Sequence, residues 1–172
     1  MRESWQDTFS VWWYRSLPFI ISVIMLLFSF IPLNSELANN ARPAVGLMCA
    51  YFWLVYRPDL FNMFSVFILG FISDVISLSP IGSSIISYLL MYVLVMHLIR
   101  YLNGKAFIVI WSGLALLLAA ALLIKWVVLS IYYNEILPFG ILIFSYMVSL
   151  AIYPVIGWVN ALVLNRYLRD DY

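Results

Sequence analysis

The chain has 172 residues, of which 66% are hydrophobic and only 10% are charged, and its mean hydropathy is +1.03. A water-soluble domain cannot carry that much apolar surface, so the composition predicts a membrane protein. The 9 basic residues nearly balance the 8 acidic residues, which gives no reason to expect a nucleic-acid partner.

Residues 1–16 predict an amphipathic helix on the cytoplasmic surface of the membrane. Trp5, Phe9, Trp12 and Trp13 recur at helical spacing opposite a polar face, a pattern typical of interfacial helices. The rings are expected to be membrane anchors, and a docking surface for a cytoplasmic partner is the alternative.

Six apolar segments follow, and a spanning helix needs about 20 such residues. They cover residues 17–33, 42–57, 60–78, 81–99, 106–131 and 136–164. The sequence therefore predicts an all-α integral membrane protein with one six-helix domain, residues 17–164, and a cytoplasmic tail, residues 165–172. Pro154 is expected to kink the last helix, because proline removes a backbone hydrogen bond.

The second segment is short. Its uncharged part is about 21 Å long at the helical rise, so it spans the bilayer only if Arg42 and Arg57 snorkel outward from its ends. A re-entrant or buried helix is the alternative.

Basic residues indicate the orientation. Those on one side of a six-helix arrangement are Arg2, Arg15, Arg57, Arg100, Lys105, Arg166 and Arg169, whereas the opposite side has only Arg42. Under the positive-inside rule, both termini are predicted to be cytoplasmic.

Two charged residues remain within predicted spans, Asp74 in the third and Lys125 in the fifth. Each costs about 2.5 to 3.5 kcal/mol at mid-membrane on insertion scales. Asp74 precedes Leu78 by four residues and Lys125 precedes Ile131 by six, so both are expected at a similar depth in the outer half, where they could pair. Snorkelling to the outer headgroups is the alternative for Lys125.

Small and polar residues surround Asp74. Gly70, Ser73, Asp74 and Ser77 share one quadrant of the third helix, which is expected to face protein, and Gly82 begins the fourth. Two roles are open for this group together with Arg42 and Lys125: a polar core that joins helices, or an outward-facing site that receives a ligand or a partner segment.

Residues suited to chemistry are scarce. Cys49 is expected to be a small buried side chain and His97 an interfacial one. The sequence has no metal-ligand cluster, phosphate-binding loop or nucleophile with a nearby histidine, so neither an enzyme nor a cofactor is predicted.

Residues 42–95 resemble the MreD family of small membrane proteins of the bacterial rod-shape system. The features in order are Arg42-Pro43 opening the second segment, a Tyr-Phe-Trp stretch, Pro58, the G-x-x-x-D element of Gly70 and Asp74, and Gly82. A weaker match is Pro154. Lys125 departs from the family, which is expected to have an acidic residue there, so no family role carries over to that position.

The resemblance implies a non-enzymatic subunit of the lateral-wall elongation complex in the bacterial cytoplasmic membrane. Its expected partners are the scaffold MreC and, indirectly, the MreB filament and the wall glycosyltransferase and transpeptidase. The fold is expected to be similar to the substrate-binding subunits of energy-coupling vitamin transporters. A vitamin-binding transport subunit is the alternative function, which the bulky first span disfavours because those subunits resemble one another in small-residue patches there.

Overall fold

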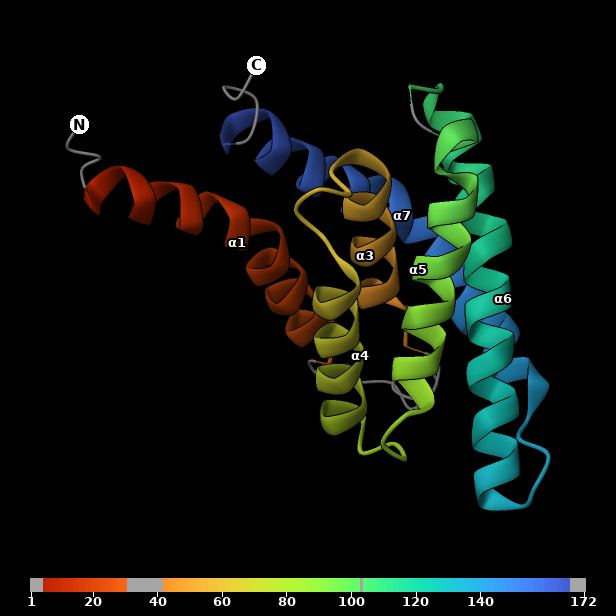
Figure 1. Cartoon of the computed structure of the whole chain (residues 1–172). Coiled ribbons are helices and arrows are strands. Elements are labelled where there is room, and N and C mark those ends of the chain that lie inside the picture. The colour runs from red at the N-terminus through yellow and green to blue at the C-terminus, as the bar shows by residue number, and fades with distance from the viewer. Residues whose placement is uncertain (1–4, 31–41, 103, 168–172) are drawn as a thin grey trace.

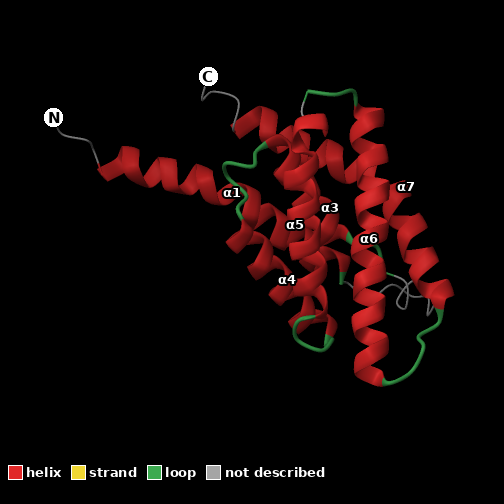
Figure 2. Cartoon of the chain, turned by 45° about the vertical axis from the view of Figure 1, so that its right-hand side comes forward, coloured by secondary structure: helices red, strands yellow, loops and turns green. Residues whose placement is uncertain are grey.

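The computed structural model of the chain describes residues 5–30, 42–102 and 104–167, with side chains described from residue 16 to residue 166 within those ranges. The described residues form six helices and no strand (Figures 1 and 2). The helices are α1 Trp5–Ser29, α3 Val45–Tyr56, α4 Met63–Ser77, α5 Ser83–Leu102, α6 Phe107–Tyr133 and α7 Phe139–Tyr167. The all-α prediction is confirmed, and the last five helices begin and end within three residues of the predicted segments.

The N-terminal helix is longer than its predicted span. Residues 5–29, which the sequence divides between an interfacial segment and a first span, form one continuous helix, α1, which contains Pro18; residues 1–4 and 31–33 of those segments lie outside the described residues. Its first part projects away from the bundle (Figure 1). Ser22 Oγ donates to Pro18 O at 2.7 Å. The predicted aromatic face of residues 5–13 lies outside the described side chains.

Helix α3 is the core of the bundle. It has 12 residues, of which all but Tyr56 are buried, and it packs against α1, α5 and α7. At the helical rise it is about 18 Å long, which is shorter than the hydrocarbon layer of about 30 Å. Its burial agrees with the buried arrangement that the sequence left open, and whether it also spans the bilayer stays a prediction. Tyr51 Oη anchors it by donating to Ile110 O on α6 at 2.7 Å.

Helices α5, α6 and α7 are long and apolar enough to cross a membrane. α4 packs against α5, and α5 packs against α6. α7 continues through Pro154, and its axis changes direction along its length (Figure 2).

The connections alternate between two ends of the bundle. The start of α1 and the end of α7 lie toward the end where α5 finishes and α6 begins (Figure 1). The α4–α5 turn and the α6–α7 connection lie at the opposite end, which we call the distal end. The number of membrane crossings and the assignment of either end to the cytoplasm remain predictions.

Candidate functional site

The α4–α5 turn brings the start of α5 back onto α4. Leu78 ends α4 in the left-handed conformation, with φ 52°. Gly82 has φ +112° immediately before α5 begins at Ser83, a conformation that an L side chain rarely adopts. The glycine that the sequence placed at the start of the fourth helix is therefore required by the backbone of this turn.

Asp74 is fully buried and accepts hydrogen bonds from the first residues of α5. Its Oδ2 accepts from Gly82 N at 2.8 Å, and its Oδ1 accepts from Ser84 N at 2.8 Å and from Ser83 Oγ at 2.9 Å. The first N–H groups of a helix have no partner within that helix. A carboxylate there satisfies them and interacts favourably with the positive end of the helix dipole. Asp74, on α4, thus caps α5.

The rest of the predicted polar quadrant fills the interface between α4 and α5. A Cβ built on Gly70 would lie 2.9 Å from the Cα of Ile85, so only glycine allows this approach of the two backbones. Ser73 Oγ donates to Ser84 Oγ at 3.5 Å. Ser77 Oγ turns back to its own helix and donates to Ser73 O at 2.6 Å. The prediction that this quadrant faces protein agrees with the burial of Gly70, Ser73 and Asp74.

Lys125 reaches the same cluster from α6. Its Nζ donates to Ser84 Oγ at 2.8 Å, and Ser84 N donates to Asp74. Ser84 therefore lies between the two charged groups. Among the described residues, the salt bridge is Arg57–Asp59 at 3.1 Å, so Lys125 and Asp74 share a polar cluster without a direct ion pair.

A cavity of about 560 Å³ lies beside this cluster. Its wall is formed by the end of α1, the residues that lead into α3, the end of α4, the start of α5, the second half of α6 and the start of α7. These elements meet toward the distal end. Most of the lining side chains are apolar, and the described lining residues include no Asp or Glu.

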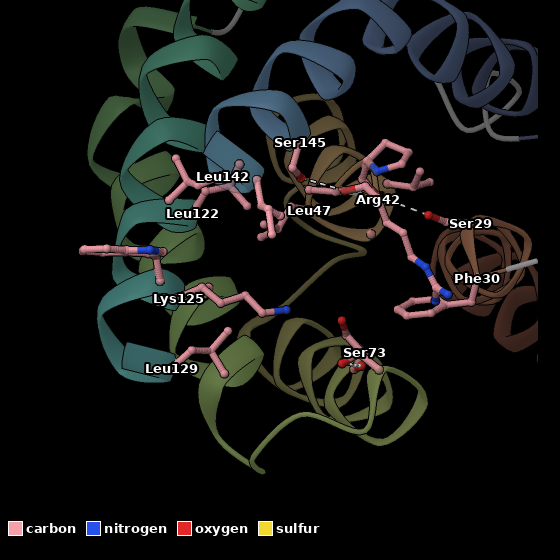
Figure 3. Close-up of a pocket in the computed structure, with 18 of the residues that line it drawn as sticks. Ser29, Phe30, Arg42, Leu47, Ser73, Leu122, Lys125, Leu129, Leu142 and Ser145 are labelled. Carbon is pink, nitrogen blue, oxygen red and sulfur yellow. Dashed lines mark hydrogen bonds between the residues drawn. The ribbon is translucent and has the colours of Figure 1, made fainter. Parts of the chain in front are cut away.

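Arg42 and Lys125 extend into this cavity from opposite walls (Figure 3). The Arg42 guanidinium lies over the ring of Phe30, with its Cζ 5.1 Å from the ring centroid, a favourable cation–π geometry. Ser145 Oγ on α7 donates to Arg42 O at 2.6 Å, and Ala44 N donates to Ser149 Oγ at 2.8 Å. The entry to α3 is thereby attached to α7.

The structure divides the predicted site residues into two groups. Gly70, Ser73, Asp74 and Gly82 form the junction of α4 with α5, whereas Arg42 faces the cavity, and Lys125 contacts both. Ser73 and Ser77 also contribute to the cavity wall. Sequence reasoning missed the cap on α5, although a carboxylate one turn before a short connection is a usable signal for it. It also missed Phe30 and Ser145, whose contacts with Arg42 join segments far apart in the chain.

The described residues contain no group of three or more His, Cys, Asp or Glu side chains that could hold a metal ion. Cys49 is buried, and His97 Nδ1 lies 2.8 Å from Val93 O, one turn earlier on its own helix. Neither residue is among those that line the cavity.

The helical bundle, its apolar outer faces and its buried polar junction define a helical membrane protein. Residues 11–163 match the family of the rod shape-determining protein MreD. The match covers most of the chain, so the chain belongs to the MreD family, whose members are structural proteins that determine cell shape. No curated protein and no solved structure matches the chain, and the predicted likeness to vitamin-binding subunits therefore stays a prediction.

Proposed function

We propose that this chain is a non-enzymatic subunit of the lateral-wall elongation complex in the bacterial cytoplasmic membrane. It binds the MreC scaffold and, through MreC, contributes to organising the MreB filament and the wall synthases. The family match over residues 11–163 carries this proposal. The long apolar helices α5, α6 and α7 support a membrane location.

We assign the Asp74 group to the bundle core rather than to the partner surface. The geometry supports this role, because the carboxylate is fully buried and both of its oxygens accept hydrogen bonds from α5. A partner could reach Asp74 only after α4 and α5 had separated. This group therefore holds together the surface that MreC contacts.

The cavity is too small to contain a transmembrane helix of a partner. One turn of helix about 10 Å wide and 5.4 Å long occupies roughly 420 Å³. The cavity of about 560 Å³ therefore holds little more than one turn, whereas a spanning helix has about 20 residues. A partner helix must instead lie along the outside of the bundle. α7 is the most suitable surface, because it is long and its apolar side chains are the least covered among the three long helices.

Site-specific photocrosslinking in living cells tests this proposal. We expect photoreactive residues at Ile143, Met147 and Val155, which are exposed on α7, to form adducts with MreC. Leu116 is an exposed comparison on α6, and Leu118 is a buried control on the same helix. Absence of MreC adducts from exposed positions on every helix, in cells that contain MreC, would refute MreC binding.

Thiol labelling tests the proposed orientation. Lys105 is exposed in the connection between α5 and α6, and Ile136 is exposed at the distal end. The native Cys49 is buried. We expect a membrane-impermeant thiol reagent to label Ile136→Cys in intact spheroplasts and Lys105→Cys only after permeabilisation. The reverse pattern would place the termini outside the cell.

A further inference from the structure

Two cationic side chains face one cavity without a carboxylate in its described lining. Lys125 Nζ has three donors, and one of them is used by Ser84 Oγ. The Arg42 guanidinium has five donors and lies against the Phe30 ring. The carboxylate of Asp74 belongs to the same polar cluster, but Ser84 lies between it and Lys125. Both of its oxygens already accept hydrogen bonds at the start of α5. Positive charge and hydrogen-bond donors therefore remain available to an anion.

The remaining wall of the cavity suits hydrocarbon. Leu26, Leu122, Leu129, Ile141 and Leu142 all contribute to it, and they come from three different helices. A cavity of about 560 Å³ lies within the usual range of roughly 300 to 1,000 Å³ for small-molecule sites. An inorganic anion alone would leave this apolar wall without a partner. The lining thus fits a molecule that combines an anionic group with an apolar chain.

We propose that the cavity binds the phosphate headgroup of an anionic membrane lipid. Arg42 donates to two phosphate oxygens in its planar geometry, and Lys125 supplies a second positive charge. The first part of an acyl chain lies against Leu129 and Ile141. The lipid comes from the leaflet at the distal end. This site does not depend on the identity of the partner protein, because it rests only on the charge and shape of the cavity.

Binding of a fluorescent lipid by the purified full-length protein tests the proposal. The probe is phosphatidylglycerol labelled at the end of an acyl chain, and its anisotropy is measured with the protein in a neutral detergent. We expect unlabelled phosphatidylglycerol to displace the probe and phosphatidylcholine to do so at least tenfold less effectively. Inorganic phosphate at the same concentration is expected to displace none.

Two variants locate the binding. Arg42→Gln and Lys125→Gln are each expected to weaken probe binding about tenfold, which corresponds to about 1.4 kcal/mol and is close to the lower end of the range for charge-assisted hydrogen bonds. Lys105→Gln is the matched control, because it removes an exposed positive charge from the opposite end of the bundle. It is expected to bind the probe as the unchanged protein does.

Four outcomes would overturn the proposal. They are equal displacement by phosphatidylglycerol and phosphatidylcholine, displacement by inorganic phosphate alone, an equal loss in Lys105→Gln, and unchanged binding in Arg42→Gln. Lys125 also bonds to Ser84 in the bundle, so Lys125→Gln is interpreted only if its circular dichroism and gel-filtration profile match those of the unchanged protein. Otherwise Arg42→Gln decides the test, because the Arg42 guanidinium lies over the Phe30 ring and does not share the bond to Ser84 that Lys125 makes.

Discussion

Replacing Asp74 by alanine tests the role of this residue as the cap of α5. The substitution removes the acceptor of Gly82 N and of Ser84 N, each bonded at 2.8 Å, and of the Ser83 hydroxyl at 2.9 Å. It leaves the backbone N–H groups of Gly82 and Ser84, and that of Ile85, which lies 3.5 Å from Oδ2, without their acceptor beside the fully buried Asp74. The helix itself offers them no other acceptor, because Gly82 precedes α5 and Ser84 and Ile85 belong to its first turn.

The expected loss of stability follows from these contacts. An unsatisfied buried donor costs about 1 to 3 kcal/mol, and loss of a helix cap costs about 0.5 to 2 kcal/mol. Polar contacts between membrane helices average only about 0.6 kcal/mol, so the lower part of the first range applies. The two short N–H bonds, from Gly82 and Ser84, and the lost charge at the helix N-terminus together give about 2 to 4 kcal/mol.

The free energy of unfolding is measured by titrating sodium dodecyl sulfate into the protein in mixed micelles and following far-UV circular dichroism. Ser77→Ala is the matched control one turn along α4, because its hydroxyl bonds to Ser73 O of its own helix and to the Ser79 hydroxyl in the following turn, whereas it accepts from no N–H group of α5; its loss is expected to cost less than about 0.5 kcal/mol. If Asp74→Ala were as stable as Ser77→Ala, the capping role would be wrong. Under conditions in which Asp74→Ala stays folded, we expect its recovery of MreC to be unchanged.

Two further substitutions test the α4–α5 junction. Gly70→Ala is expected to destabilise the bundle by about 1 to 3 kcal/mol, because its Cβ would lie 2.9 Å from the Ile85 backbone. The control in the same unfolding assay is Gly140→Ala, whose Cβ meets nothing within 4 Å. Equal stability of the two variants would contradict the close approach of α4 and α5. Exchanging Asp74 and Lys125 is expected not to restore stability lost in either single replacement, because a lysine at position 74 cannot accept from the N–H groups of α5; recovery of the double variant would indicate a direct ion pair instead.

The buried helix α3 illustrates the limit of hydropathy as a predictor. The apolar run from Ala44 to Tyr56 predicted a helix, and a helix forms there. Its length alone left spanning, re-entrant and buried arrangements open. Its burial came from the helices around it, because α1, α5 and α7 cover it and the contact of Ala44 N with Ser149 Oγ fixes its start against α7.

The sequence by itself determined the membrane class, five of the helix positions to within three residues, and the face of α4 that is buried. These properties follow from local hydropathy and from the helical repeat, which are properties of the chain within a few turns. Only the tertiary structure decided what Asp74 bonds to and that Lys125 and Arg42 share a cavity. The partners of a buried polar group depend on which backbone donors the fold brings to it. Here that depended on the sharp turn at Gly82 and on the packing of α6 against α5.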